Sequence, residues 1–152
     1  MKFKNVIEIQ APVSDVFEFV ADLRNTPKWN YYVVRVIQEN GDGPTTGARY
    51  HQTRRTDQQR YEITQYEEKK SLTVKTLPGS SPVFERQMRF ETVADGTRLI
   101  DEWTLRTGYP GMFERLAVSR ISGAVDENLG KLKELLENGQ TRLQSGRVSK
   151  LR

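Results

Sequence analysis

Two neighbouring strand-like segments, residues 83–93 and 97–107, each place one charged side chain among apolar ones. Alternation along the segments puts Arg86 and Asp101 on the same side as the apolar residues, which are Phe84, Met88, Phe90, Leu99, Trp103 and Leu105. An arginine and an aspartate on one face of neighbouring strands can pair, and pairing offsets much of the cost of burying either charge. The pair is either a structural ion pair or a group that orients the polar part of an apolar ligand.

Acid–base chemistry has few other candidates. Imidazole is the side chain that titrates closest to neutral pH, so a proton transfer would use His51, the one histidine, or Asp101. No serine–histidine–acid spacing surrounds His51, and the sequence has no glycine-rich phosphate loop, nucleophile elbow or metal-ligand cluster. We therefore predict no metal and no cofactor. Five tyrosines could hydrogen-bond a ligand, although most are expected to pack: Tyr31, Tyr32, Tyr50, Tyr61 and Tyr66.

A sheet must position these residues, because most of the chain has the pattern of strands. Alternation and turn residues predict strands at 3–10, 32–39, 48–56, 60–68, 71–77, 83–93 and 97–107, a short helix at 13–20 and a brief helical turn at 22–27. From residue 48 onward the separators are only a few residues long, whereas parallel strands need crossovers of a dozen or more. The spacing predicts an antiparallel meander.

One long helix, residues 112–137, must cover this whole sheet. Its apolar stripe is Val118, Ile121, Val125, Leu129, Leu132 and Leu136. A helix is about 10 Å wide, whereas seven strands about 4.8 Å apart span about 30 Å. The sheet must therefore curl around the helix, and the space between them is either filled by large side chains or kept as a ligand pocket.

Two features of this helix stand out. Its first turns, Met112 to Ala117, are apolar on nearly all sides, which predicts burial on several sides or a place at the pocket mouth. Gly123 and Gly130 fall on the outward half of the helix. They reflect either close packing or tolerated weakness, or they allow a local bend that opens the cavity.

Composition indicates one soluble domain. The chain has 152 residues, of which 36% are hydrophobic and 29% charged, and it has no cysteine. No stretch approaches the roughly 18 apolar residues that cross a bilayer, and the N-terminus has no signal-peptide pattern. We therefore expect no transmembrane segment and a cytoplasmic location.

The net charge of +4 lies in the last fourteen residues, 139–152, which hold four basic side chains and no acid. This basic tail is either a solvated, frayed extension or a contact for an anionic partner such as RNA or a membrane surface. A second basic group, Arg54, Arg55 and Arg60, surrounds a hairpin turn at Asp57 and is either solvated or a phosphate contact.

Several motifs resemble the START-like, polyketide cyclase/dehydrase (SRPBCC) superfamily over residues 3–137. They are Ile7–Pro12, Val16–Phe17, Asp22–Trp29, Gly47–Tyr50 and Gly96–Leu99. The resemblance implies an α+β helix-grip fold: a curved seven-stranded antiparallel sheet around a long C-terminal helix, with two short helices after the first strand. It implies a domain over residues 1–138 that encloses a cavity for a lipophilic ligand, followed by the basic tail at 139–152. The superfamily has no universal catalytic motif.

We therefore expect a protein that binds, and could transport, a hydrophobic or amphipathic small molecule between the sheet and the long helix. The predicted cavity lining is Trp29, Tyr50, Leu72, Val74, Phe84, Arg86, Met88, Phe90, Leu99, Asp101, Trp103, Phe113, Ala117, Val118, Ile121 and Val125. One alternative is an aromatase/cyclase- or dehydratase-like enzyme that uses the same cavity, with Asp101 or His51 moving a proton. Another is a partner of the ribosome, nucleic acid or a lipid surface that uses the tail. A homodimer is also left open.

Overall fold

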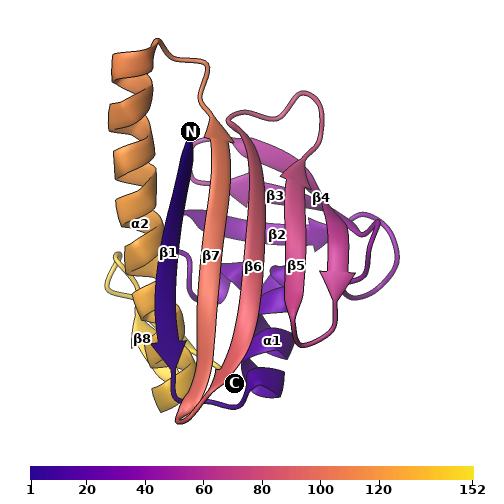
Figure 1. The fold of residues 1–152 in the computed structure, drawn as a ribbon, viewed down its shortest axis with the longest axis vertical. Coiled ribbons are helices and arrows are strands. Elements are labelled where there is room, and N and C mark those ends of the chain that lie inside the picture. The colour runs from indigo at the N-terminus through magenta and orange to yellow at the C-terminus, as the bar shows by residue number, and fades with distance from the viewer.

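The computed structural model describes residues 1–152 and has a curved sheet wrapped around one long helix (Figure 1). The elements in chain order are β1 (Lys2–Ile9), α1 (Val13–Ala21), the 3-10 helix η1 (Leu23–Lys28), β2 (Val33–Gln38), β3 (Arg49–Arg54), β4 (Gln58–Glu67), β5 (Ser71–Thr76), β6 (Val83–Val93), β7 (Gly96–Arg106), α2 (Gly111–Asn138), β8 (Gln140–Arg142) and β9 (Val148–Lys150). The predicted α+β helix-grip fold is confirmed.

Seven strands form one sheet in the order β1-β7-β6-β5-β4-β3-β2, and every neighbouring pair is antiparallel. The meander from β2 to β7 follows the chain, and β1 closes the far edge by pairing with β7. The turn between β6 and β7 lies against β1: a Cβ on Gly96, whose φ is +151°, would collide with the carbonyl oxygen of Ile9. Glycine is therefore required where β7 begins.

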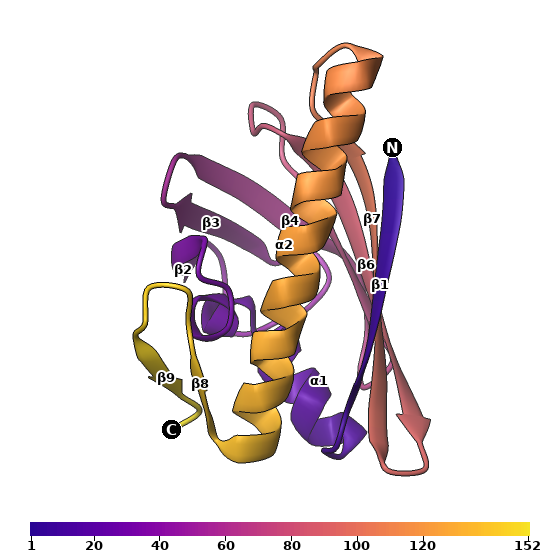
Figure 2. The same ribbon diagram turned by 90° about the vertical axis from the view of Figure 1, so that its left-hand side faces the viewer.

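The sheet bends strongly between its two edges. Figure 1 shows β2 and β3 running across the direction of β5, β6 and β7. The register shifts between Val33 and Arg35 on β2 and between Ile63 and Gln65 on β4. Such irregularities increase local twist and bend a strand. The concave side that results faces α2, which crosses it diagonally in Figure 2.

The C-terminal half of α2 is anchored to β1 and the core. Leu129, Leu132 and Leu135 are at most 1% exposed. Hydrogen bonds join the helix to the edge strand and to the residue after it: Lys133 Nζ donates to the Glu8 carbonyl oxygen at 2.6 Å, and the Gln10 amide donates to Glu137 Oε2 at 2.7 Å. The helix ends at Gly139, whose left-handed conformation lets its amide bond back to Leu135.

The basic tail is not frayed, which corrects one expectation. Strands β8 and β9 form an antiparallel hairpin that packs beside α2 (Figure 2). Thr141, Leu143 and Ser149 are buried, and Ser149 Oγ donates to the Lys28 carbonyl oxygen at 2.6 Å. The basic side chains Arg142, Arg147, Lys150 and Arg152 remain exposed. No helix in the chain is long and apolar enough to cross a membrane.

Candidate functional site

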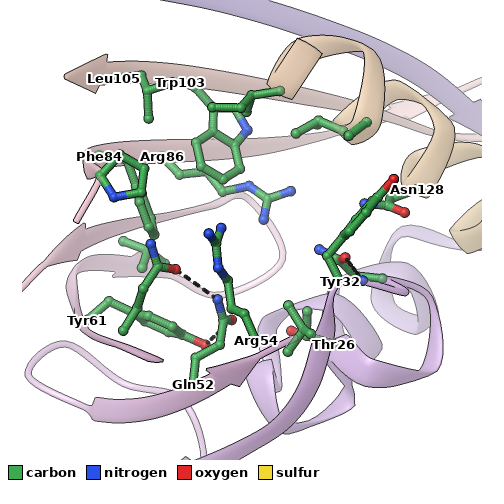
Figure 3. Close-up of a pocket in the computed structure, with 18 of the residues that line it drawn as sticks. Thr26, Tyr32, Gln52, Arg54, Tyr61, Phe84, Arg86, Trp103, Leu105 and Asn128 are labelled. Carbon is green, nitrogen blue, oxygen red and sulfur yellow. Dashed lines mark hydrogen bonds between the residues drawn. The ribbon is translucent and has the colours of Figure 1, made fainter. Parts of the chain in front are cut away.

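A pocket of about 390 Å³ lies between the sheet and α2 (Figure 3). This volume falls within the range of small-molecule sites in proteins. Of its 24 lining residues 13 are hydrophobic, so the walls are apolar over much of their area. The apolar lining includes Val74, Phe84, Met88, Trp103 and Leu105 from the sheet, Ile121, Ala124 and Val125 from α2, and Leu23, Trp29 and Val33 from η1 and its flanks.

Arg86 is held rigidly in the sheet wall. Its Nε and Nη2 donate to the two carboxylate oxygens of Asp101 at 2.7 and 2.6 Å. The guanidinium carbon also lies 4.6 Å from the ring centre of Trp103 and 5.8 Å from that of Trp29. Asp101 is fully buried, whereas Arg86 reaches the pocket surface (Figure 3). The predicted pairing on one face of β6 and β7 is present, and it presents an arginine to the pocket while hiding the aspartate.

A chain of hydrogen bonds crosses the wall formed by β3 and β4. Tyr61 Oη donates to Gln52 Oε1 at 3.2 Å, Gln52 Nε2 donates to Gln59 Oε1 at 3.1 Å, and Gln59 Nε2 donates to the Ser81 carbonyl oxygen at 3.2 Å. Figure 3 shows the first two of these bonds. Burial raises the pKa of the Tyr61 phenol above its usual range, so this hydroxyl stays protonated.

Three further arginines line the pocket: Arg54, Arg55 and Arg120. Arg54 is neutralised by Asp57 through bonds of 2.7 and 2.9 Å. Arg55 has no carboxylate partner; it stacks 3.8 Å from the ring centre of Tyr31 and donates from Nε to the Tyr31 carbonyl oxygen at 2.8 Å. Arg120, on the exposed side of α2, forms no ion pair. No aspartate, glutamate or lysine lines the pocket.

The pocket wall also contains donors without partners. The indole Nε1 atoms of Trp29 and Trp103 are buried and make no hydrogen bond within the protein. Because these two nitrogens have almost no accessible surface, they lie behind the pocket surface and are not contacts offered to a ligand.

Half of the predicted lining residues lie on the pocket surface: Trp29, Val74, Phe84, Arg86, Met88, Trp103, Ile121 and Val125. Five others belong to the hydrophobic core and do not line the pocket: Tyr50, Leu72, Phe90, Leu99 and Val118. Asp101 is also buried and lies behind Arg86. Phe113 is 60% exposed, and neither Phe113 nor Ala117 lines the pocket. The first turns of α2 extend beyond the end of the sheet in Figure 2, so they are not buried.

His51 lies away from the pocket. It alternates with Tyr50 and Gln52, which face inward, and its Nε2 is 2.8 Å from Oε1 of Gln58 in an exposed pair. The structure therefore does not bring His51 together with Asp101, the other candidate for proton transfer. No group of three or more His, Cys, Asp or Glu side chains could hold a metal ion.

Sequence reasoning missed several polar lining residues, among them Gln52, Gln59, Arg120 and Asn128. Alternation with Tyr61 could have identified Gln59 as inward-facing. Helical spacing could have identified Asn128, which follows Ile121 by seven residues and Val125 by three. Its side chain is held by the tail, because Gln144 Nε2 donates to Asn128 Oδ1 at 3.3 Å. The hairpin thus supports the α2 wall of the pocket.

A curved sheet that grips one long helix over a mostly apolar pocket defines a protein of the helix-grip fold. The chain belongs to the family described as polyketide cyclase/dehydrase and lipid transport, whose model matches residues 1–137. No curated protein matches the chain in sequence.

Solved structures share this fold at low sequence identity. A protein from Nitrosospira multiformis is 17% identical, with a TM-score of 0.71 over 90% of this chain and 96% of that one. The Aha1 dimer from Colwellia psychrerythraea is 16% identical, with a TM-score of 0.68 over 90% and 96%. DynU16, a putative protein of the dynemicin biosynthetic locus, is 22% identical, with a TM-score of 0.71 over 91% of this chain and 48% of DynU16. At these identities the likeness shows the fold alone.

Proposed function

We propose that the chain binds a compact hydrophobic or amphipathic small molecule in the pocket between the sheet and α2. The observation that carries the proposal is the cavity itself, about 390 Å³ with largely apolar walls. Empty apolar space costs stability, because the lining atoms lose packing partners. A space of this size is therefore better explained by an occupant than by folding. Burial of ligand surface at about 25 cal/mol per Å² supplies the affinity.

The volume limits the ligand. An apolar cavity of about 150 Å³ holds one benzene molecule, so this pocket has room for roughly two to three rings. Trp29, Phe84 and Trp103 offer aromatic faces to such a ligand. Transport of the ligand is a further step, which requires release as well as binding.

The enzymatic alternative, a cyclase or dehydratase, has weaker support. The titratable groups on the pocket surface are arginines and tyrosines, and Asp101 is covered by Arg86. A cyclase could still act by shape alone, folding a reactive chain against the walls. Turnover of a polyketide-like substrate by the purified protein would establish this alternative.

Native mass spectrometry of protein purified from its own host tests the binding proposal. The expected result is a small molecule that stays bound in the gas phase and is released on unfolding. A second arm titrates N-phenyl-1-naphthylamine, a neutral fluorescent probe of two linked aromatic units, and records fluorescence and melting temperature. A mass without adduct, together with no probe binding, would overturn the proposal.

A macromolecular partner of the basic hairpin is a separate proposal, and its test must spare the fold. Deleting residues 142–152 would remove the buried Leu143 and Ser149 along with the charges. Replacing Arg142, Arg147 and Lys150 by glutamine removes charge from exposed positions only. Retention of the folded state with loss of RNA or anionic-vesicle binding would support the partner, and unchanged binding would dismiss it.

A homodimer likewise stays a proposal for this chain, supported by exposed apolar side chains at the start of α2. Tyr109, Met112, Phe113 and Leu116 are each more than half exposed. Light scattering of the protein and of its Leu116→Glu variant tests it. A dimer mass that falls to the monomer mass in the variant is expected if this surface pairs with a second copy.

A further inference from the structure

The amide and guanidinium groups of the pocket are unbalanced: among them, the groups that lack a partner are donors. Four amide side chains line the pocket, Asn30, Gln52, Gln59 and Asn128, and each oxygen already accepts a hydrogen bond from the protein. By contrast, the Nη1 group of Arg86 is free, because Asp101 bonds only to Nε and Nη2. A ligand that completes these bonds must supply acceptors.

The charged residues of the lining also favour a ligand that supplies acceptors. All four charged residues that line the pocket are arginines. Asp101 neutralises Arg86 and Asp57 neutralises Arg54, so Arg55 and Arg120 carry the uncompensated positive charge. Arg55 is also held in place by its stack on Tyr31, which leaves both terminal nitrogens of the guanidinium free. A preorganised guanidinium binds carboxylates and related oxyanions through two parallel hydrogen bonds.

We infer that the ligand is an amphipathic anion, with an apolar ring body in the pocket and a carboxylate or sulfonate group held by Arg55 and Arg120. This inference rests on the proposed function and specifies its ligand class. The body lies against Phe84, Trp103 and Ile121. The acid group stays near the exposed arginines, where it avoids the cost of full desolvation. A neutral lipophile of the same shape fills the same space but leaves the cationic groups without a counter-charge.

A pair of matched fluorescent probes tests this directly. 8-Anilinonaphthalene-1-sulfonate has the same ring system as N-phenyl-1-naphthylamine and adds one sulfonate. We expect the anionic probe to bind at least about tenfold more tightly, as a charge-assisted hydrogen bond allows. Its affinity should fall as salt rises from about 0.01 M to about 1 M, whereas that of the neutral probe should not fall.

Charge-removing variants locate the acid group. Arg120→Gln and Arg55→Gln should each weaken the anionic probe by about tenfold and leave the neutral probe within about twofold. Arg115→Gln is the matched control, since Arg115 is exposed on the same helix but does not line the pocket. Its affinities should match those of the unaltered protein. Competition extends the test to carboxylates: 2-naphthoate should displace the anionic probe, and 2-naphthamide should not.

Three results would overturn the inference. Equal affinity for both probes would leave the binding function standing and remove the acid group. An equal loss in Arg115→Gln and Arg120→Gln would show a general charge effect and no site. Unchanged fluorescence of the anionic probe in Ala124→Phe, which fills the pocket, would place the probe on the surface. If neither probe binds and no mass is retained, the proposed function itself has failed.

Discussion

The interior of the protein has a filled end and a hollow end, and both are covered by the same helix. At the filled end, the C-terminal half of α2 buries Leu129, Leu132 and Leu135 in one core cluster with residues of α1 and the sheet. At the hollow end, Ile121 and Val125 face the pocket, and the helix continues beyond it to exposed apolar turns. The apolar face of one helix thus packs in the core at one end and lines the pocket at the other.

The comparison teaches that apolar character alone does not distinguish core from pocket in this fold. We expect the filled end to contribute more to stability than the hollow end, because its α2 side chains are fully buried. The hydrogen bonds from Lys133 to β1 and from Gln10 to Glu137 lie at this anchored end. Substitutions that are chemically identical should therefore have different effects at the two ends.

The largest difference is expected between two leucines of α2. Leu132→Ala removes a fully buried side chain and should lower the free energy of unfolding by about 2–5 kcal/mol. Leu116→Ala, at a position that is 57% exposed, should change it by no more than about 0.5 kcal/mol. Urea denaturation of both variants measures the two values. Similar losses would contradict the comparison, and a concentration-dependent loss for Leu116→Ala would indicate a dimer through that surface.

Replacing an alanine by phenylalanine should lower the stability at the filled end but not at the hollow end. Ala124→Phe places a ring in the pocket and should weaken N-phenyl-1-naphthylamine by at least about tenfold, or about 1.4 kcal/mol. The free energy of unfolding should be unchanged or higher, since the ring fills a void.

Ala21→Phe is the matched change at the filled end, where Ala21 is 1% exposed. Overpacking there should cost about 1–3 kcal/mol of stability. Loss of stability in Ala124→Phe equal to that in Ala21→Phe would mean that the hollow end has no usable space.

Two buried tyrosines, Tyr50 and Tyr61, predict that the stability of the protein falls at alkaline pH. Tyr50 and Tyr61 stack with their rings 5.7 Å apart, and burial raises the pKa of Tyr50 to about 12. The folded protein then keeps a proton that the unfolded chain loses above about pH 10, so stability falls as pH rises from about 10 to 12. Tyr50→Phe should remove about 1.4 kcal/mol of this loss at pH 11. Denaturation at pH 8 and 11 measures it, with Tyr109→Phe, at an exposed site, as the control.

The sequence predicted the fold well because its signals are local. Alternation located β6 and β7 and brought Arg86 and Asp101 to one face. On β3 the inward-facing residues after Tyr50 are polar, so the alternation of apolar and polar residues does not mark the inward side. Gln52 and Arg54 were therefore missed as pocket residues. These side chains are buried or held by partners on β4 and at the turn, and no local pattern encodes such pairings.

The extent of the pocket along α2 was the other part that could not be predicted. The spacing of apolar residues gives the face of a helix but not its position along the sheet. Phe113 and Ala117 share the face of Ile121, yet they lie past the end of the lining. The hairpin after Gly139 was missed for a similar reason, since strands of three residues are too short to show a period.

The smallest expected effect concerns the two glycines of α2, one in each half. A Cβ added to Gly123 or Gly130 would meet no atom within 4 Å, so close packing does not explain either residue. Each change to alanine should raise the free energy of unfolding by about 0.5–1 kcal/mol. If a bend at Gly123 admits the ligand, Gly123→Ala should slow probe association in stopped-flow measurements while Gly130→Ala does not. Equal association rates in both variants would mean that the pocket fills without bending the helix.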